Sequence, residues 1–217
     1  MTRTNDAGSN RQPSHEGNIT MKSLGAKTIA VPTPVWIIGS YDAQERPNAM
    51  AIAWGGICCS KPPAVTISLR KATYTYGSIM ARQAYTVNIP SDKHLHEADY
   101  FGIVSGRDID KFAETGLTPV KSDLVDAPYL GEFPLILECK VIHTHEIGLH
   151  TQFIGEIVNV RCDEAVLAEN GLPDLAKVRP LIYSPPNGTY YGVDVNFGKA
   201  YKVGSGFKKG KSEDNDD

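Results

Sequence analysis

The residues best suited to chemistry form one short segment, Arg70-Lys71-Ala72-Thr73-Tyr74-Thr75. It supplies two cations, two short hydroxyl groups and consecutive main-chain N–H groups, which together can satisfy several oxygens of a phosphate. On spacing alone, the segment fits the solvated end of a strand as well as a phosphate clip. Both interpretations stay open at this point.

The stretch before this segment is made of small residues, which suits close approach by a flat ligand. Residues 49–54 form an apolar run with almost no large side chain, so their backbone is accessible. A planar ring with polar edges needs donors and acceptors at fixed spacing, and an unpaired strand edge provides them. We therefore expect such a ring to bond the main chain of Asn48, Ala49, Met50 and Ala51.

The small-residue stretch at 48–54, here called the platform, and the segment at 70–75, here called the clip, together predict a phosphorylated planar cofactor. A small-residue core strand is the alternative for residues 48–54. Trp54 fits either a place beside the ring or a place in the core.

The vicinal pair Cys58-Cys59 invites a redox interpretation. Adjacent cysteines bridge only through a strained peptide, and no Cys-x-x-Cys spacing is present. We therefore expect both cysteines in a turn between residues 49–54 and 64–69, with Cys58 a main-chain contact of the cofactor. Four cysteines without a disulfide framework indicate a reduced, cytoplasmic protein.

Histidines near the middle of the chain offer a metal site as the competing hypothesis. His143 and His145 alternate along an expected strand, so their rings share one face. The other ligands available nearby are Cys139 and His150, with Glu138 or Glu156 as the only carboxylates. Chance clustering is the alternative.

The elements that must position these residues are mostly strands. Period-two patterns and turn residues predict strands at residues 35–41, 49–54, 64–69, 85–89, 135–142 and 152–160. Helical spacing predicts helices at 76–83, capped by Thr75, at 92–101, and from Ser105 or Asp108 to Gly116. Strands with short inserted helices indicate a mainly β, antiparallel barrel.

Lys111 falls on the last of these helices. Ile109 and Phe112 are spaced to anchor one face, which leaves Lys111 free to reach elsewhere. A lone lysine on a helix is also a common surface residue, and the pattern does not separate the two interpretations.

Composition limits the partners. The chain has 217 residues, 41% of them hydrophobic, and a net charge of −3, which gives no reason to expect nucleic acid. No apolar run is long enough to cross a membrane, and the start lacks the apolar core of a secretory signal. We expect a disordered extension at 1–20, one domain at 21–203 and a flexible charged tail at 204–217.

Several exact stretches resemble the flavin reductase-like, FMN-binding split-barrel family and, within it, its flavoredoxin branch. The resemblance covers about residues 21–203, and it is carried by PTPV at 32–35, PNAM at 47–50, WGGICCSKPP at 54–63, SLRKATY at 68–74, SGRDIDKF at 105–112 and GLHTQFIGE at 148–156.

The resemblance implies a six-stranded antiparallel Greek-key split barrel, FMN as cofactor and a homodimer whose subunits complete each other's flavin sites. It assigns residues 70–75 to phosphate binding and brings Lys111 toward the flavin. It also turns His150 toward the cofactor pocket, where an imidazole facing the substrate or nicotinamide suits proton transfer. Tyr190 and Tyr191 fit the pocket, the subunit interface or ordinary packing.

Two functions follow from the resemblance: an FMN-holding carrier that passes electrons to a partner protein, or an NAD(P)H:flavin oxidoreductase. Ala51-Ile52-Ala53-Trp54 stands where typical reductases carry hydroxyl-rich residues, which favours the carrier. The chain has no Gly-x-Gly-x-x-Gly fingerprint for a separate dinucleotide domain. A flavin-free barrel with a histidine metal site is the hypothesis from a different class.

Overall fold

The computed structural model of the protein describes residues 19–207. Residues 1–18 and 208–217 lie outside this part, and with them most of the extension expected at 1–20 and of the tail expected at 204–217. No helix in the described part is long and apolar enough to span a membrane.

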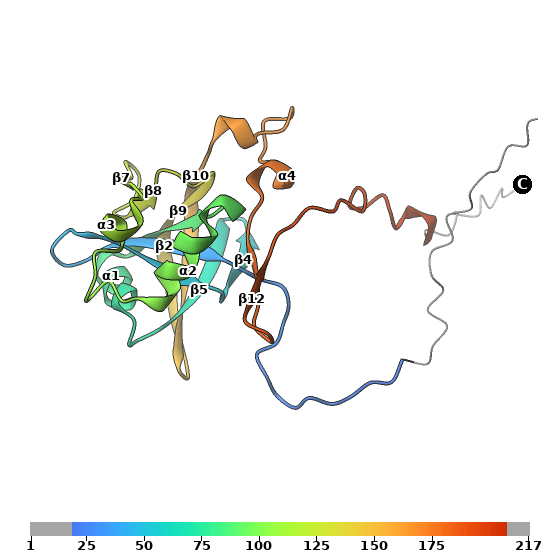
Figure 1. The fold of residues 1–217 in the computed structure, drawn as a ribbon, viewed down its shortest axis with the longest axis horizontal. Helices are drawn as coiled ribbons and strands as arrows, with labels where there is room; N and C mark the ends of the chain where they lie inside the picture. Colours follow the sequence, from blue (N-terminus) through green and yellow to red (C-terminus); the bar gives the residue numbers. More distant parts are fainter. Residues whose placement is uncertain (1–18, 208–217) are drawn as a thin grey trace, which may run out of the picture.

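A seven-stranded antiparallel sheet curls into the barrel, with the order β3-β2-β6-β9-β10-β5-β4 (Figure 1). Its strands are β2 Trp36–Tyr41, β3 Pro47–Ile52, β4 Gly55–Ser60, β5 Pro63–Arg70, β6 Ala84–Ile89, β9 Leu135–Ile147 and β10 His150–Cys162. The mainly β split barrel expected from the sequence is confirmed, with one strand more than the expected six.

Two smaller sheets flank the barrel. One joins β1 Thr33–Pro34, β11 Ile182–Ser184 and β12 Thr189–Tyr191, and the other pairs β7 Pro119–Lys121 with β8 Pro128–Leu130. The first of these sheets pairs β1, early in the described residues, with β11, late in them.

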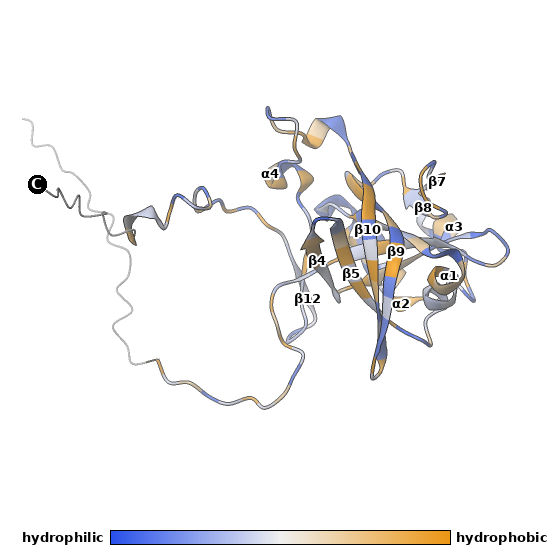
Figure 2. Ribbon diagram, turned by 180° about the vertical axis from the view of Figure 1, so that it is seen from behind, coloured by the Kyte–Doolittle hydropathy of each residue, from blue (hydrophilic) through white to orange (hydrophobic). Residues whose placement is uncertain are grey.

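Every second side chain of β5 is apolar and points into the barrel interior. Val65, Ile67 and Leu69 are buried there and pack with Tyr85 and Phe153 in one hydrophobic cluster. Figure 2 shows hydrophobic residues gathered on β5, β9 and β10, whereas the loops are largely hydrophilic. The predicted buried face of this strand is therefore confirmed.

Within residues 19–207, four α-helices are inserted between the strands: α1 Tyr74–Arg82, α2 Leu95–Ile103, α3 Lys111–Thr115 and α4 Leu175–Val178. The first begins two residues earlier than expected, and its N-cap is Thr73 rather than Thr75. Thr75 cannot cap the helix because its hydroxyl oxygen is buried and accepts a hydrogen bond from Asn48.

The helix expected to begin at Ser105 or Asp108 is much shorter. It begins only at Lys111, because the Asp110 carboxylate accepts the main-chain N–H groups of Phe112 and Ala113 and so acts as the N-cap. Gly116 ends the helix as predicted, with φ of +70°.

The turn predicted at Cys58 and Cys59 is also wrong. Cys58 and Cys59 belong to β4, where a bulge between Ile57 and Cys59 lets the strand continue along β5. The β9–β10 strands run on until only Gly148 and Leu149 connect them, so the hairpin is longer than expected.

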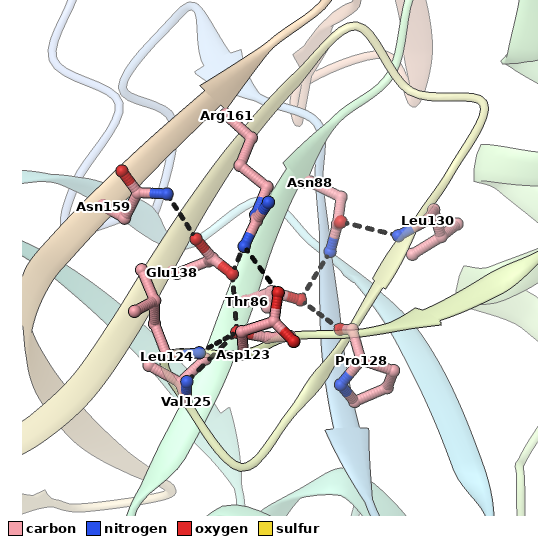
Figure 3. Close-up of polar contacts among 11 residues, drawn as sticks. Thr86, Asn88, Asp123, Leu124, Val125, Pro128, Leu130, Glu138, Asn159 and Arg161 are labelled. Atoms are coloured by element: carbon pink, nitrogen blue, oxygen red, sulfur yellow. Dashed lines mark hydrogen bonds and ion pairs between the residues drawn. The ribbon is translucent and has the colours of Figure 1, made fainter.

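A buried polar network connects the outer face of the sheet to the segment that packs on it (Figure 3). Glu138 is fully buried, accepts hydrogen bonds from Ser122 (2.5 Å) and Asn159 (2.6 Å), and pairs with Arg161 at 3.0 Å. Nearby, Thr86 donates to the oxygen of Pro128. These bonds hold the segment that carries β7 and β8 against β6 and β9.

Candidate functional site

A cleft of about 320 Å³ opens between the first turn of α1, strand β3 and the segment that follows α2. Six of the residues expected at the site line it: Met50, Ala51, Ala72, Thr73, Thr75 and Lys111. The structure therefore brings the small-residue platform, part of the clip and the distant lysine together.

The floor of the cleft is an edge strand. Within the described sheet β3 pairs only with β2, so its other edge presents main-chain groups without a strand partner. This is the arrangement that the sequence predicts for bonding the polar edge of a planar ring.

Asn48, on β3, does not line this cleft but lines a smaller pocket of about 190 Å³ that adjoins it. Its side chain is 5% exposed, and its amide nitrogen donates to the Thr75 hydroxyl at 2.9 Å. Its amide oxygen has no partner among the described residues. A buried acceptor without a donor costs on the order of 1–3 kcal/mol.

Gly106 makes the close packing around Asn48 possible. A Cβ built on Gly106 would lie 1.9 Å from the Asn48 amide oxygen. Only glycine fits here, because any side chain would push Asn48 away from Thr75 or into the cleft.

The first turn of α1 forms the anion-binding side of the cleft. Thr73, the N-cap, makes no side-chain capping hydrogen bond, so main-chain N–H groups of this turn stay available. The positive end of the helix dipole lies at the same place. Such a turn fits a phosphate group.

Arg107 adds a cation that the sequence reasoning missed. It lines the cleft, and its guanidinium carbon lies 5.6 Å from the centroid of the Tyr74 ring. It stands four residues before Lys111 in the SGRDIDKF stretch, so that stretch contained a signal for Arg107 as well as for Lys111.

Behind Arg107, Tyr74 is held by a buried carboxylate. Asp42 accepts hydrogen bonds from the Tyr74 hydroxyl and from the Arg46 side chain, both at 2.8 Å. Burial raises the pKa of Asp42, but the bonds from the Arg46 main chain and from Tyr74 outweigh it, so the pKa falls below its ordinary value. This ionised carboxylate fixes the wall on which Arg107 rests.

Lys111 reaches away from its own helix, as the spacing allows, and it is not the surface lysine of the alternative interpretation. Its side chain is 4% exposed, and its ammonium donates to the main-chain oxygens of Ala49 (2.8 Å) and Phe101 (3.0 Å). Burial lowers the pKa of this lysine to about 8. Lys111 thus ties β3 to α2 beneath the cleft, and its charge stays close to the floor.

Other expected site residues lie away from the cleft of their own chain. Lys71 is 55% exposed and pairs with Glu146 at 2.6 Å, and Arg70 is exposed beside it. Cys58 is exposed on β4, where partial burial raises the pKa of its thiol. Trp54 and His150 do not line the cleft either.

The histidine metal site is not formed within residues 19–207. The rings of His143 and His145 stack with centroids 6.1 Å apart, but Cys139 is buried. No group of three or more His, Cys, Asp or Glu residues in this part of the chain could hold a metal ion.

A second groove, of about 370 Å³, adjoins the cleft and shares Ala51, Gly102 and Ile103 with it. Its far wall is aromatic: the rings of Tyr183 and Tyr190 lie 5.6 Å apart. The Tyr190 hydroxyl donates to Asp99 at 2.8 Å. Burial is the larger cause, and the Asp99 carboxylate the smaller one, of a Tyr190 pKa raised to about 12.

Comparisons with known proteins agree with this geometry. Residues 28–192 match the family model described as flavin reductase like domain. The structure of flavoredoxin from Desulfovibrio vulgaris (Miyazaki F) is 55% identical, with a TM-score of 0.82, over 85% of this chain and 100% of that chain.

More distant relatives carry related names. Flavoredoxin from Methanosarcina acetivorans is 29% identical with a TM-score of 0.80, over 86% of this chain and 99% of that one. High molecular weight rubredoxin from Moorella thermoacetica is 29% identical over 71% of this chain and 59% of its own length.

Proposed function

This chain belongs to the flavin reductase-like family, and on that premise we propose that it is an FMN-binding flavoprotein of the flavoredoxin type. The observation that carries the proposal is the cleft itself. The open first turn of α1 lines this 320 Å³ cleft, and the unpaired buried acceptor of Asn48 lies at the adjoining pocket, which shares Gly106, Arg107 and Lys111 with the cleft.

The residues present fit FMN from end to end. The edge of β3 and the Asn48 amide oxygen suit the polar edge of the flavin ring, which offers both donors and acceptors. The N–H groups of Tyr74 and Thr75, with Arg107, suit its terminal phosphate, whereas the Thr73 N–H already donates to the Arg70 oxygen. Lys111 holds the floor in place from below.

Bound FMN supplies hydride and single-electron transfer, and the chain binds and orients it. The cleft needs no protein nucleophile for this chemistry. Reduction adds negative charge to the flavin, and the buried cation of Lys111 lies where it would favour that charge.

We also propose a homodimer in which each subunit completes the other's site. The β9–β10 hairpin reaches well beyond the barrel (Figure 1), and near its tip His150 pairs with Arg70 without lining the cleft of its own chain. Such a projection suits contact with the cleft of a second copy. In that arrangement His150, Lys71 and Arg70 would contribute across the interface.

The electron-carrier function is the preferred form of this proposal. The platform residues Ala51 and Ala53 offer no hydroxyl group to a nicotinamide, and two of the solved structures that resemble this chain over 85% and 86% of its length are flavoredoxins. An NAD(P)H:flavin oxidoreductase is the second candidate. We further propose that residues 21–203 form one domain and that the protein is cytoplasmic.

Mixing with nicotinamides distinguishes the two forms. The FMN-loaded protein is mixed with NADH or NADPH in a stopped-flow instrument, and flavin bleaching is followed. A carrier is reduced slowly or not at all by either donor. Rapid reduction that saturates with one donor would instead establish the oxidoreductase.

A further inference from the structure

The C-terminal arm, residues 195–207, exposes an unusual amount of aromatic surface. Phe197 is 91% exposed, Tyr201 99% and Phe207 94%. Figures 1 and 2 show this arm running away from the barrel after β12. Large apolar side chains that contact nothing in their own fold usually mark an interaction surface.

Among the described residues, the hydrogen bonds of the arm also show no contact with the barrel of the same chain. The hydrogen bonds that residues 195–207 make within the described part all join residues of the arm itself: Gly198 to Asn196, Lys202 and Val203 to Lys199, Ser205 to Lys202, and Phe207 to Gly204. Nothing in this set ties the arm to the barrel of the same chain.

The groove beside the candidate site has the chemistry to receive this arm. Its walls include Ala53, Ile103 and the ring of Tyr183, and it contains the carboxylate of Asp99. In the arm, Lys199 stands midway between Phe197 and Tyr201. An aromatic side chain in the groove would therefore bring a lysine close to Asp99.

The origin of the arms favours a second copy as the partner. The N-terminal arm, residues 19–31, enters the three-stranded sheet at β1, and the C-terminal arm leaves the same sheet at β12. Both arms run out on the same side of the barrel (Figure 1). Two copies related by a two-fold axis can exchange such arms, so that the arm of each subunit packs on the barrel of the other.

We propose that residues 195–207 of each chain dock in the groove between Ala53, Ile103 and Tyr183 of a second copy. The proposal rests on the dimer proposed above and adds its contact surface. Because the groove shares Ala51, Gly102 and Ile103 with the cofactor cleft, the arm of one subunit would border the flavin site of the other.

Photo-crosslinking tests the docking directly. A benzophenone amino acid replaces Phe197 in the full-length protein, which is then irradiated across a dilution series. We expect a covalent species of twice the 23.6 kDa chain mass, with crosslinks that map to peptides containing Ile103 or Tyr183. The same amino acid at exposed Leu172, which does not line the groove, is the matched control.

Every other outcome overturns the proposal. Crosslinks confined to a single chain mean that the arm folds back on its own barrel, and the absence of crosslinks means that it docks nowhere. Analytical ultracentrifugation and flavin titration of the same sample separate the proposals. A dimer that binds FMN but shows no arm crosslink leaves the proposed function intact and rejects the arm.

A second variant guards against disturbance by the probe. Replacing both aromatics, Phe197→Ser with Tyr201→Ser, should raise the dimer dissociation constant at least tenfold, whereas Ala200→Ser should leave it unchanged. Equal dissociation constants in both variants would contradict the docking.

Discussion

The ammonium nitrogen of Lys111 lies 2.8 Å from the main-chain oxygen of Ala49, on the strand that forms the floor of the cleft. The same nitrogen lies 3.0 Å from the oxygen of Phe101 in α2. One buried cation thus joins the platform strand to the helix beside it. The position of β3 relative to the rest of the cleft therefore depends on a side chain that is 62 residues away in the sequence.

Lys111 should make stability depend on alkaline pH. Its pKa is about 8 in the folded protein and about 10.4 in an unfolded chain. Between these values the unfolded state binds the extra proton, so the free energy of unfolding rises with pH, on the order of 1 kcal/mol per pH unit.

The measurement is urea unfolding of wild type and Lys111→Met between pH 7 and about 10.4. We expect the difference between the two proteins to grow in favour of wild type above about pH 8. A difference that stays constant over this range would mean that the lysine titrates at its ordinary value.

Glu138 should make stability depend on acidic pH. Burial raises its pKa, but hydrogen bonds from Ser122, Asn159 and Arg161 outweigh this and leave it below the ordinary value. A lowered pKa means that the stabilisation is present above about pH 4.3 and is lost as the pH falls through the folded-state pKa.

Glu138→Gln should therefore unfold with about 2 kcal/mol less free energy at neutral pH, because charge-assisted hydrogen bonds are lost. The gap should close as the pH falls below about 4. Asp123→Asn is the control: Asp123 is 89% exposed and 3.9 Å from Arg161, and its loss should change little. An equal loss of unfolding free energy in both variants would show that the buried network of Glu138 does not stabilise the fold.

Gly106 and Gly77 form a matched pair for the packing at Asn48. Gly106→Ala should weaken FMN binding at least tenfold, because its Cβ would overlap the Asn48 amide oxygen. Gly77 lies inside α1 with open space around it, so Gly77→Ala should raise stability by about 0.5–1 kcal/mol. Flavin fluorescence titration and thermal unfolding measure the two effects. Normal FMN affinity in Gly106→Ala would show that Asn48 is not part of the site.

Arg107 and Lys71 distinguish two versions of the phosphate clip. Arg107→Ala should weaken FMN about tenfold, which corresponds to about 1.4 kcal/mol, and should leave riboflavin binding unchanged because riboflavin lacks the phosphate. Lys71→Ala should have a smaller effect, since its ammonium pairs with Glu146 outside the cleft of its own chain. If Lys71→Ala costs more than Arg107→Ala, the clip is the cationic one predicted from sequence.

Local patterns predicted much of the fold. The alternation of Val65, Ile67 and Leu69 predicts their burial, and Gly116 marks the end of α3. The partners of Lys111 could not be predicted, because helical spacing says nothing about a strand and a helix that reach it only through tertiary packing. The strand β4 was missed for a related reason: small residues at 55–60 resemble a turn until β5 supplies their hydrogen bonds.

In the site, too, features set by neighbouring residues could be predicted, whereas features that depend on tertiary packing could not. The expectation that Ala72, Thr73 and Thr75 lie together is met at the cleft, since neighbours in sequence stay neighbours at the end of a strand. Arg107 was missed because its role depends on the ring of Tyr74, which comes from a different element. Asn48 was expected to act through its main chain, whereas the structure adds an unpaired side-chain oxygen.

The visible absorption spectrum of freshly purified protein, followed by identification of the released chromophore, tests the central proposal most directly. We predict a yellow protein that releases FMN in near-equal ratio to chains. A colourless protein that binds added flavin only weakly would contradict the carrier and favour an enzyme that uses flavin as a substrate. A protein that neither carries nor binds flavin would refute the proposed function.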